Sequence, residues 1–95
     1  MAYAALAIHH PRPEHRDDLI GVMRETARRA SAGAPGLIGM SSYADTRSGR
    51  LVGLSRWESL EALEAVLEPA IAGAAEYDRV WGEKPTDVLV LEELE

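Results

Sequence analysis

The fold is decided by the middle of the chain, which reads LIGMSSYADTRSGRLVGLSRW over residues 37–57. Its two ends, Leu37–Tyr43 and Arg50–Trp57, carry the apolar residues of predicted strands. The five residues Asp45-Thr46-Arg47-Ser48-Gly49 are rich in turn formers and predict the loop that joins these strands. We therefore expect an antiparallel hairpin at the centre of the chain.

A strand and a helix are predicted before the hairpin. The strand covers Tyr3–His9, and Pro11 and Pro13 end it. The helix covers Pro13 to about Ala32, since Leu19, Ile20, Met23, Ala27 and Ala30 recur every three or four residues. Gly33, Pro35 and Gly36 end the helix before the hairpin begins.

After the hairpin, Ser59 can cap a second helix whose inner residues are Leu60, Leu63 and Leu67. Pro69 lacks a backbone donor and clashes with the preceding turn, so we expect a break there and a new short helix from Pro69 to Val80. A loop over Gly82–Pro85 and a last strand over Asp87–Leu91 complete the prediction.

The predicted order of elements is βαββαβ, which is the ferredoxin-like arrangement within the α+β class. It has a four-stranded antiparallel sheet with both helices on one face. The last strand contains Val88, Leu89, Val90 and Leu91 in succession, so both of its faces are apolar. The uncovered sheet face needs a partner, and a second copy of the chain is the simplest one. We expect a homodimer, but the sequence does not say whether Leu89 or Val90 faces the partner.

Composition narrows the classes of function. The length of 95 residues fits a single domain spanning 1–95, and 46% of the residues are hydrophobic. There is no cysteine, which excludes disulfides and thiolate sites, and the net charge of −6 argues against nucleic acid as a partner. Met1–Ile8 lacks the features of a signal peptide, and no run is long enough to span a membrane, so a cytoplasmic location without membrane contact is expected.

Three stretches resemble the antibiotic-biosynthesis monooxygenase family of dimeric α+β barrels. They are Pro11-Arg12-Pro13-Glu14 before the first helix, Ala34-Pro35-Gly36-Leu37 before the second strand, and Arg56-Trp57-Glu58-Ser59-Leu60-Glu61-Ala62-Leu63. The resemblance covers nearly the whole chain. It implies two sheets packed face to face across a dimer, and a pocket in each subunit between sheet and helices.

The family includes cofactor-free oxygenases of polyketide-derived phenols, haem-degrading enzymes and proteins without known activity, so the fold alone does not fix the reaction. Many members carry a histidine nine residues after the tryptophan, where this chain has Val66. Haem-degrading members also use an asparagine in the first strand, and this chain contains none, which disfavours haem degradation. Cofactor-free phenol oxygenases often use an asparagine as well, so the absence of asparagine also weakens the assignment as a phenol oxygenase.

Few residues are candidates for a site. His9 or Tyr77 could be a catalytic base, and Trp57 and Trp81 could bind a substrate. For Trp57, ordinary core packing is an equal alternative. Tyr77 and Trp81 share a helix face and could form a pocket lid or, slightly preferred, a small core that docks the helix on the sheet. We expect one pocket bordered by Trp57 and at least one of His9, Tyr77 and Trp81.

No metal site is predicted, because His9 and His10 are adjacent in an extended stretch and point to opposite faces. For all three histidines, including His15, exposed loop positions are expected. The leading functional hypothesis is a monooxygenase that needs no cofactor and acts on a small aromatic or polyketide-type ligand. The alternatives are a non-catalytic ligand-binding or stress-related dimer, and a cyclase or isomerase that uses the same pocket.

Overall fold

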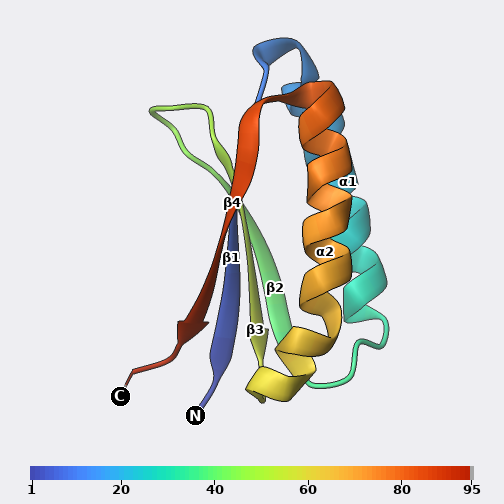
Figure 1. Cartoon of the computed structure of the whole chain (residues 1–95), viewed down its shortest axis with the longest axis vertical. Coiled ribbons are helices and arrows are strands. Elements are labelled where there is room, and N and C mark those ends of the chain that lie inside the picture. Colours follow the sequence, from blue (N-terminus) through green and yellow to red (C-terminus); the bar gives the residue numbers. More distant parts are fainter. Residues whose placement is uncertain (95) are drawn as a thin grey trace.

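The computed structural model describes residues 1–94 and contains a four-stranded antiparallel sheet with two helices on one side (Figure 1). The strand order in the sheet is β2-β3-β1-β4. Along the chain the elements are β1 (Tyr3–Pro11), the 3₁₀ turn η1 (Pro13–His15), α1 (Arg16–Ser31), β2 (Leu37–Ala44), β3 (Leu51–Trp57), α2 (Leu60–Trp81) and β4 (Gly82–Glu92). The predicted ferredoxin-like βαββαβ fold is confirmed.

The core lies between the sheet and the two helices. Leu51 and Trp57 of β3, Leu19 of α1 and Leu63 of α2 are each at most 4% exposed. The Met23 methyl group on α1 lies 3.8 Å from the position that a Cβ atom on Gly53 would occupy, so this face of β3 faces the helices. Since side chains alternate along a strand, the register of the sheet assigns every other strand residue to the helix-facing side or to the opposite, outer face.

The hairpin between β2 and β3 forms as predicted. The Asp45 N–H donates to the Arg50 carbonyl over 2.8 Å. The Asp45 carboxylate accepts hydrogen bonds from the Ser48 hydroxyl and the Arg47 N–H and pairs with Arg50 at 3.2 Å. The hydrogen bond from Ser48 is the main cause that lowers the pKa of Asp45 to about 2. The loop is therefore held by its own side chains.

The predicted break at Pro69 is wrong. α2 is a single helix from Leu60 to Trp81 with Pro69 inside it, and it starts where predicted, with the Ala62 N–H donating to the Ser59 hydroxyl over 3.1 Å. In Figure 1 the first turns of α2, drawn in yellow, run at an angle to the later turns, so the helix bends without ending. Pro69 is exposed, so its ring meets solvent, and the helix loses one backbone hydrogen bond while packing before and after it holds both halves.

The predicted loop over Gly82–Pro85 is also wrong. β4 begins at Gly82, directly after the last residue of α2, and continues to Glu92. β4 is an edge strand that pairs only with β1, so Pro85 can be accommodated without removing a central ladder bond. The register shifts between the pairs Ile8–Asp87 and His10–Lys84, which marks an irregularity beside Pro85.

The outer face of the sheet is apolar, as the sequence predicts. Leu6, Leu54 and Leu89 are cross-strand partners on this face, and both helices lie on the other side (Figure 1). Leu89 is 45% exposed, Leu91 is 40% exposed and Tyr43 is 55% exposed. The homodimer stays a prediction, but the register now assigns Leu89 to the outer face and Val90 to the helix-facing side.

Candidate functional site

A chain of hydrogen bonds connects His9 of β1 to Asp78 of α2 through Thr86 of β4. His9 faces the helices, because its register partner is the buried Leu51. Its Nδ1 atom lies 2.9 Å from the Thr86 hydroxyl. Thr86 donates from its hydroxyl to Asp78 Oδ1 and from its backbone N–H to Asp78 Oδ2, each over 2.7 Å. We call this arrangement the His9 relay.

The His9 relay fixes the tautomer of neutral His9. A carboxylate only accepts hydrogen bonds, so the Thr86 hydroxyl donates its proton to Asp78 and accepts one from His9 Nδ1–H. The unprotonated nitrogen of neutral His9 is then Nε2. No buried side-chain nitrogen or oxygen among residues 1–94 lacks a hydrogen-bond partner, and His9 Nε2 has none there, so this atom reaches solvent. It is free to accept a proton from a bound molecule.

The electrostatic environment keeps His9 neutral near pH 7. Burial lowers the pKa of His9 below its ordinary value of 6.5, since the protonated form is poorly solvated there. The Asp78 carboxylate opposes this shift, and the neighbouring His10 adds to it. His9 therefore combines a fixed tautomer with the protonation state that a general base requires.

His10 points to the other side of β1, as the predicted strand alternation requires. Its side chain is buried, and its Nε2 atom lies 2.8 Å from Asp87 of β4. The expectation that His9 and His10 occupy exposed loop positions is wrong, because β1 extends through both to Pro11. Within residues 1–94, no three His, Asp or Glu side chains come together in a group that could hold a metal ion.

Tyr77 and Trp81 share a helix face, as their spacing predicts. Their rings stack with centroids 5.6 Å apart, and His15 of η1 stacks on the same tryptophan at 6.0 Å. His15 also lies 3.1 Å from Asp18. This aromatic stack (His15, Tyr77 and Trp81) joins the end of α2 to the start of α1. Arg79 points elsewhere, toward Glu76, as predicted.

Trp57 is separated from these groups. It is 4% exposed, and its indole N–H donates to the Ser55 hydroxyl over 2.9 Å. Its register partner on β1 is Tyr3, whereas His9 pairs with Leu51 at the other end of the same ladder. The two positions are six residues apart along the strand, which corresponds to about 20 Å. Trp57 and His9 therefore cannot border one small pocket, and the geometry of Trp57 is that of a core residue.

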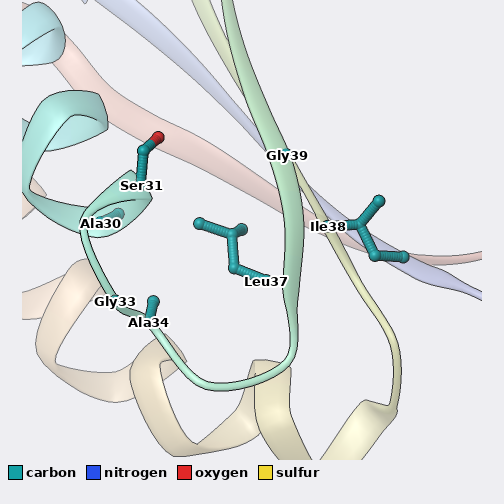
Figure 2. Close-up of a pocket in the computed structure, with 7 residues that line it drawn as sticks. All are labelled: Ala30, Ser31, Gly33, Ala34, Leu37, Ile38 and Gly39. Atoms are coloured by element: carbon teal, nitrogen blue, oxygen red, sulfur yellow. The ribbon is translucent and has the colours of Figure 1, made fainter.

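Two hollows lie elsewhere on the molecule. The smaller, of about 150 Å³, lies where α1 leads into β2. Figure 2 shows Leu37 pointing toward the helix there, and Ile38 pointing away from it on the other side of the strand. The larger, of about 440 Å³, is lined by His10, Arg16, Arg50 and Lys84 among others. Neither is lined by His9, Trp57, Tyr77 or Trp81, so the predicted pocket that combines these residues is not one of them.

The sequence did not indicate Thr86 and Asp78 as site residues. They lie eight positions apart. Asp78 is on the second helix, and Thr86 lies between the predicted loop and the predicted last strand. Only the immediate passage from α2 into β4 brings them together beside His9. The available signal would have been a histidine that faces the helices with a threonine beside it on the neighbouring strand. This signal can be recognised only once the register of the two strands is known.

Solved structures with the same fold are found over the whole chain. A protein from Mycobacterium tuberculosis superposes with a TM-score of 0.83 at 24% identity, covering 100% of this chain and 97% of its own. A candidate antibiotic biosynthesis monooxygenase from Deinococcus radiodurans gives a TM-score of 0.81 at 16% identity, with 100% and 94% covered. A monooxygenase from Streptomyces coelicolor, solved with the ligand nanaomycin D, gives 0.77 at 16% identity, with 99% and 88% covered.

No protein-family model matches the sequence, and no curated protein matches it. These structural similarities are at identities of 16–24%, so they establish a shared fold and leave the reaction open. The resemblance to the antibiotic-biosynthesis monooxygenases is therefore confirmed at the level of the fold.

Proposed function

We propose that this chain is a small monooxygenase that oxidises an aromatic, polyketide-type substrate without a metal or flavin, with His9 as the general base. The observation that carries the proposal is the His9 relay. The relay holds His9 by Nδ1 and leaves Nε2 accessible, and the burial of His9 keeps the imidazole neutral. The shared fold with monooxygenase structures adds support.

The reaction needs only a base and oxygen. His9 Nε2 removes a proton from the activated CH₂ group of a phenolic ketone, and the resulting carbanion transfers electrons to O₂ and forms a C–O bond. The peroxide takes the proton back from His9. Loss of the second C–H proton and of hydroxide then gives a carbonyl and water. One oxygen atom enters the product and one leaves as water, so the substrate supplies all four electrons.

The aromatic stack is the proposed contact for the substrate ring. Tyr77 is 38% exposed and its ring lies nearly parallel to that of Trp81, at 13°. An aromatic ligand can extend such a stack with offset rings. Tyr77 directly precedes Asp78 on α2, so the same turn of the helix carries one residue of the aromatic stack and one residue of the His9 relay. Tyr77 is the second candidate for the base.

The test is oxygen uptake with anthrone by purified protein free of metal and flavin. General bases contribute about 10²–10⁴-fold to rate, so His9→Ala should lower kcat by at least 100-fold. Thr86→Val should lower kcat less, because His9 stays but loses its orientation. Thr26→Val, at an exposed threonine of α1, is the matched control and should leave the rate unchanged. If Tyr77→Phe abolishes uptake and His9→Ala does not, the base is misassigned.

Binding is measured separately with nanaomycin D, the ligand of the Streptomyces coelicolor structure. Quenching of tryptophan fluorescence that persists in His9→Ala and is lost in Trp81→Leu would support the proposed stack and a chemical role for His9. An unchanged signal in Trp81→Leu would contradict the stack as the binding surface. A cyclase or isomerase with the same base would consume substrate without oxygen, so an anaerobic reaction separates that alternative.

A non-catalytic ligand-binding dimer is the second candidate function. The observation in its favour is that neither hollow described above is lined by His9, Trp57, Tyr77 or Trp81. This candidate predicts fluorescence quenching without oxygen uptake or substrate turnover under any condition. Turnover by wild-type protein that depends on His9 would exclude it.

We also propose that the chain forms a homodimer through the outer face of its sheet. Leu89 and Val90 are adjacent and equally exposed, at 45% each, but lie on opposite faces. Leu89→Glu should convert the dimer to a 10.3 kDa monomer in sedimentation velocity, because it places a charge in the interface. Val90→Glu is the matched control and should stay dimeric. A wild-type monomer, or dissociation by Val90→Glu alone, would contradict this interface.

A further inference from the structure

The larger hollow gathers three cationic side chains on a negatively charged chain. It lies at the upper end of the sheet in Figure 1, where the β2–β3 hairpin, the turn from β1 into α1 and the start of β4 come together. Arg16, Arg50 and Lys84 line it, one from each of these segments, and Glu83 is the only carboxylate among its lining residues. We call it the basic hollow. The net charge of the whole chain is −6, so this concentration of cations is local.

We propose that the basic hollow binds a small organic anion that carries a dianionic phosphate or dicarboxylate group on an apolar body. This proposal concerns a second site and does not depend on the proposed oxygenase activity.

Two of its cations have no internal partner. Arg16 and Lys84 make no ion pair with any acidic group among residues 1–94, as is also true of Arg12, Arg24 and Arg47 outside the hollow, but only in the hollow do two such cations line one concave surface. Arg16 is also the first residue of α1, where the helix dipole disfavours a positive charge. Lys84 is the only lysine of the chain. A bound anion would supply the partner that both side chains lack.

Two other residues that line the basic hollow, Arg50 and His10, are held by hydrogen bonds within the chain. Arg50 donates to Ser48 over 2.8 Å and pairs with Asp45, so the hairpin presents a guanidinium held in place whose charge is partly compensated. His10 is held by Asp87. Two uncompensated cations beside one compensated cation suit a doubly charged group better than a single carboxylate, and Arg in particular can grip it with two parallel hydrogen bonds.

The hollow is too large for a bare ion. Its volume is about 440 Å³, and Pro11 and Pro13 contribute rigid apolar surface to it. An aromatic or aliphatic body can lie on these rings while its anionic group meets Arg16 and Lys84. Glu83 on the same rim would repel a second anionic group at that position, so the site should prefer ligands with charge at one end.

The site is separate from the His9 relay. His10 lines the basic hollow, and His9 does not, because successive residues of β1 point to opposite faces. A variant can therefore lose anion binding without losing phenol oxidation, and the reverse.

The experiment is a titration of ¹⁵N-labelled protein with phenyl phosphate at low salt, followed by amide chemical shifts. We expect saturable shifts at Arg16, Gly49 and Lys84. Arg16→Gln and Lys84→Gln should each weaken the affinity about five- to tenfold, since each removes one charged hydrogen-bond donor. Arg24→Gln is the matched control, at an exposed arginine of the same helix, and should change nothing. Affinity should fall as NaCl is added.

Further ligands separate the parts of the proposal. Phthalate tests a dicarboxylate in place of a phosphate, and saturable binding of either supports the site. Equal affinity for inorganic phosphate would overturn the role of the apolar body, and equal affinity for phenol would overturn the role of the charge. Absence of saturable shifts with both phenyl phosphate and phthalate at millimolar concentration, or an equal loss of affinity in Arg24→Gln, would overturn the site itself.

Discussion

Gly36 should be the glycine that the fold can least replace. It precedes β2 with φ +78°, a backbone conformation that side chains disfavour, and a Cβ atom there would lie 2.6 Å from the Ala62 Cβ on α2. The Gly36 carbonyl also accepts the Glu58 N–H over 2.8 Å, which fixes the backbone beside the helix start. Gly49 has the same φ of +78°, but nothing lies within 4 Å of the corresponding position.

Comparing Gly36→Ala with Gly49→Ala separates two contributions to the loss in the free energy of unfolding. An alanine with positive φ costs about 1–2 kcal/mol, and this applies equally to Gly36→Ala and Gly49→Ala. A methyl group forced into packed surroundings costs roughly a further 1–3 kcal/mol, and this applies only to Gly36→Ala. We therefore expect a loss of about 1–2 kcal/mol for Gly49→Ala and about 2–5 kcal/mol for Gly36→Ala.

Urea denaturation followed by circular dichroism measures both losses. In a domain of this size each kcal/mol lowers Tm by about 4–8 °C, so thermal melts give a second reading. Ala62→Gly should restore part of the stability of Gly36→Ala, because it removes the opposing methyl group. Equal losses for the two glycine variants, or no restoration by Ala62→Gly, would refute the close approach as the cause.

Three further predictions concern His9, Pro69 and Ser59. Burial lowers the pKa of His9 from 6.5, so the unfolded chain binds this proton more readily than the folded chain. The free energy of unfolding should therefore decrease as the pH falls through about 6.5 toward the lowered pKa. Urea titrations should show a smaller decrease for His9→Gln, and an identical dependence on pH in both proteins would contradict the buried, neutral state. Pro69→Ala should raise the free energy of unfolding by up to about 3 kcal/mol, since it restores a helix donor and removes a clash; a loss would mean that the bend in α2 is required. Ser59→Ala should cost about 1 kcal/mol, whereas Ser59→Asp should cost little because aspartate also caps helices; equal losses would argue against the cap.

Local chemistry was sufficient to predict most of the fold. The turn residues around Asp45, the cap at Ser59 and the apolar spacing in α1 each determine an element without help from distant residues. The two errors in α2 and β4 have the opposite origin. The propensity of Pro69 to end a helix was overridden by tertiary packing, and Pro85 could enter a strand because that strand is an edge.

The candidate site was predictable only in part. His9 was named because strand alternation placed it opposite Leu6 and Ile8, and the Tyr77–Trp81 pair followed from helical spacing. The separation of Trp57 from His9 could not be read from the sequence, because it depends on which ends of β1 and β3 meet. The basic hollow joins residues from three distant segments and has no local signature.

The direct passage from α2 into β4 limits how the length of this chain can vary. One residue inserted after Trp81 would shift β4 by one position, which turns every side chain of the strand to the other face. Thr86 would then leave His9, and Leu89 would turn toward the helices. Insertions in the hairpin over residues 45–50 carry no such penalty, because that loop projects beyond the sheet (Figure 1). Homologues that keep the His9 relay should therefore differ in length at the hairpin while conserving the eight-residue spacing from Asp78 to Thr86.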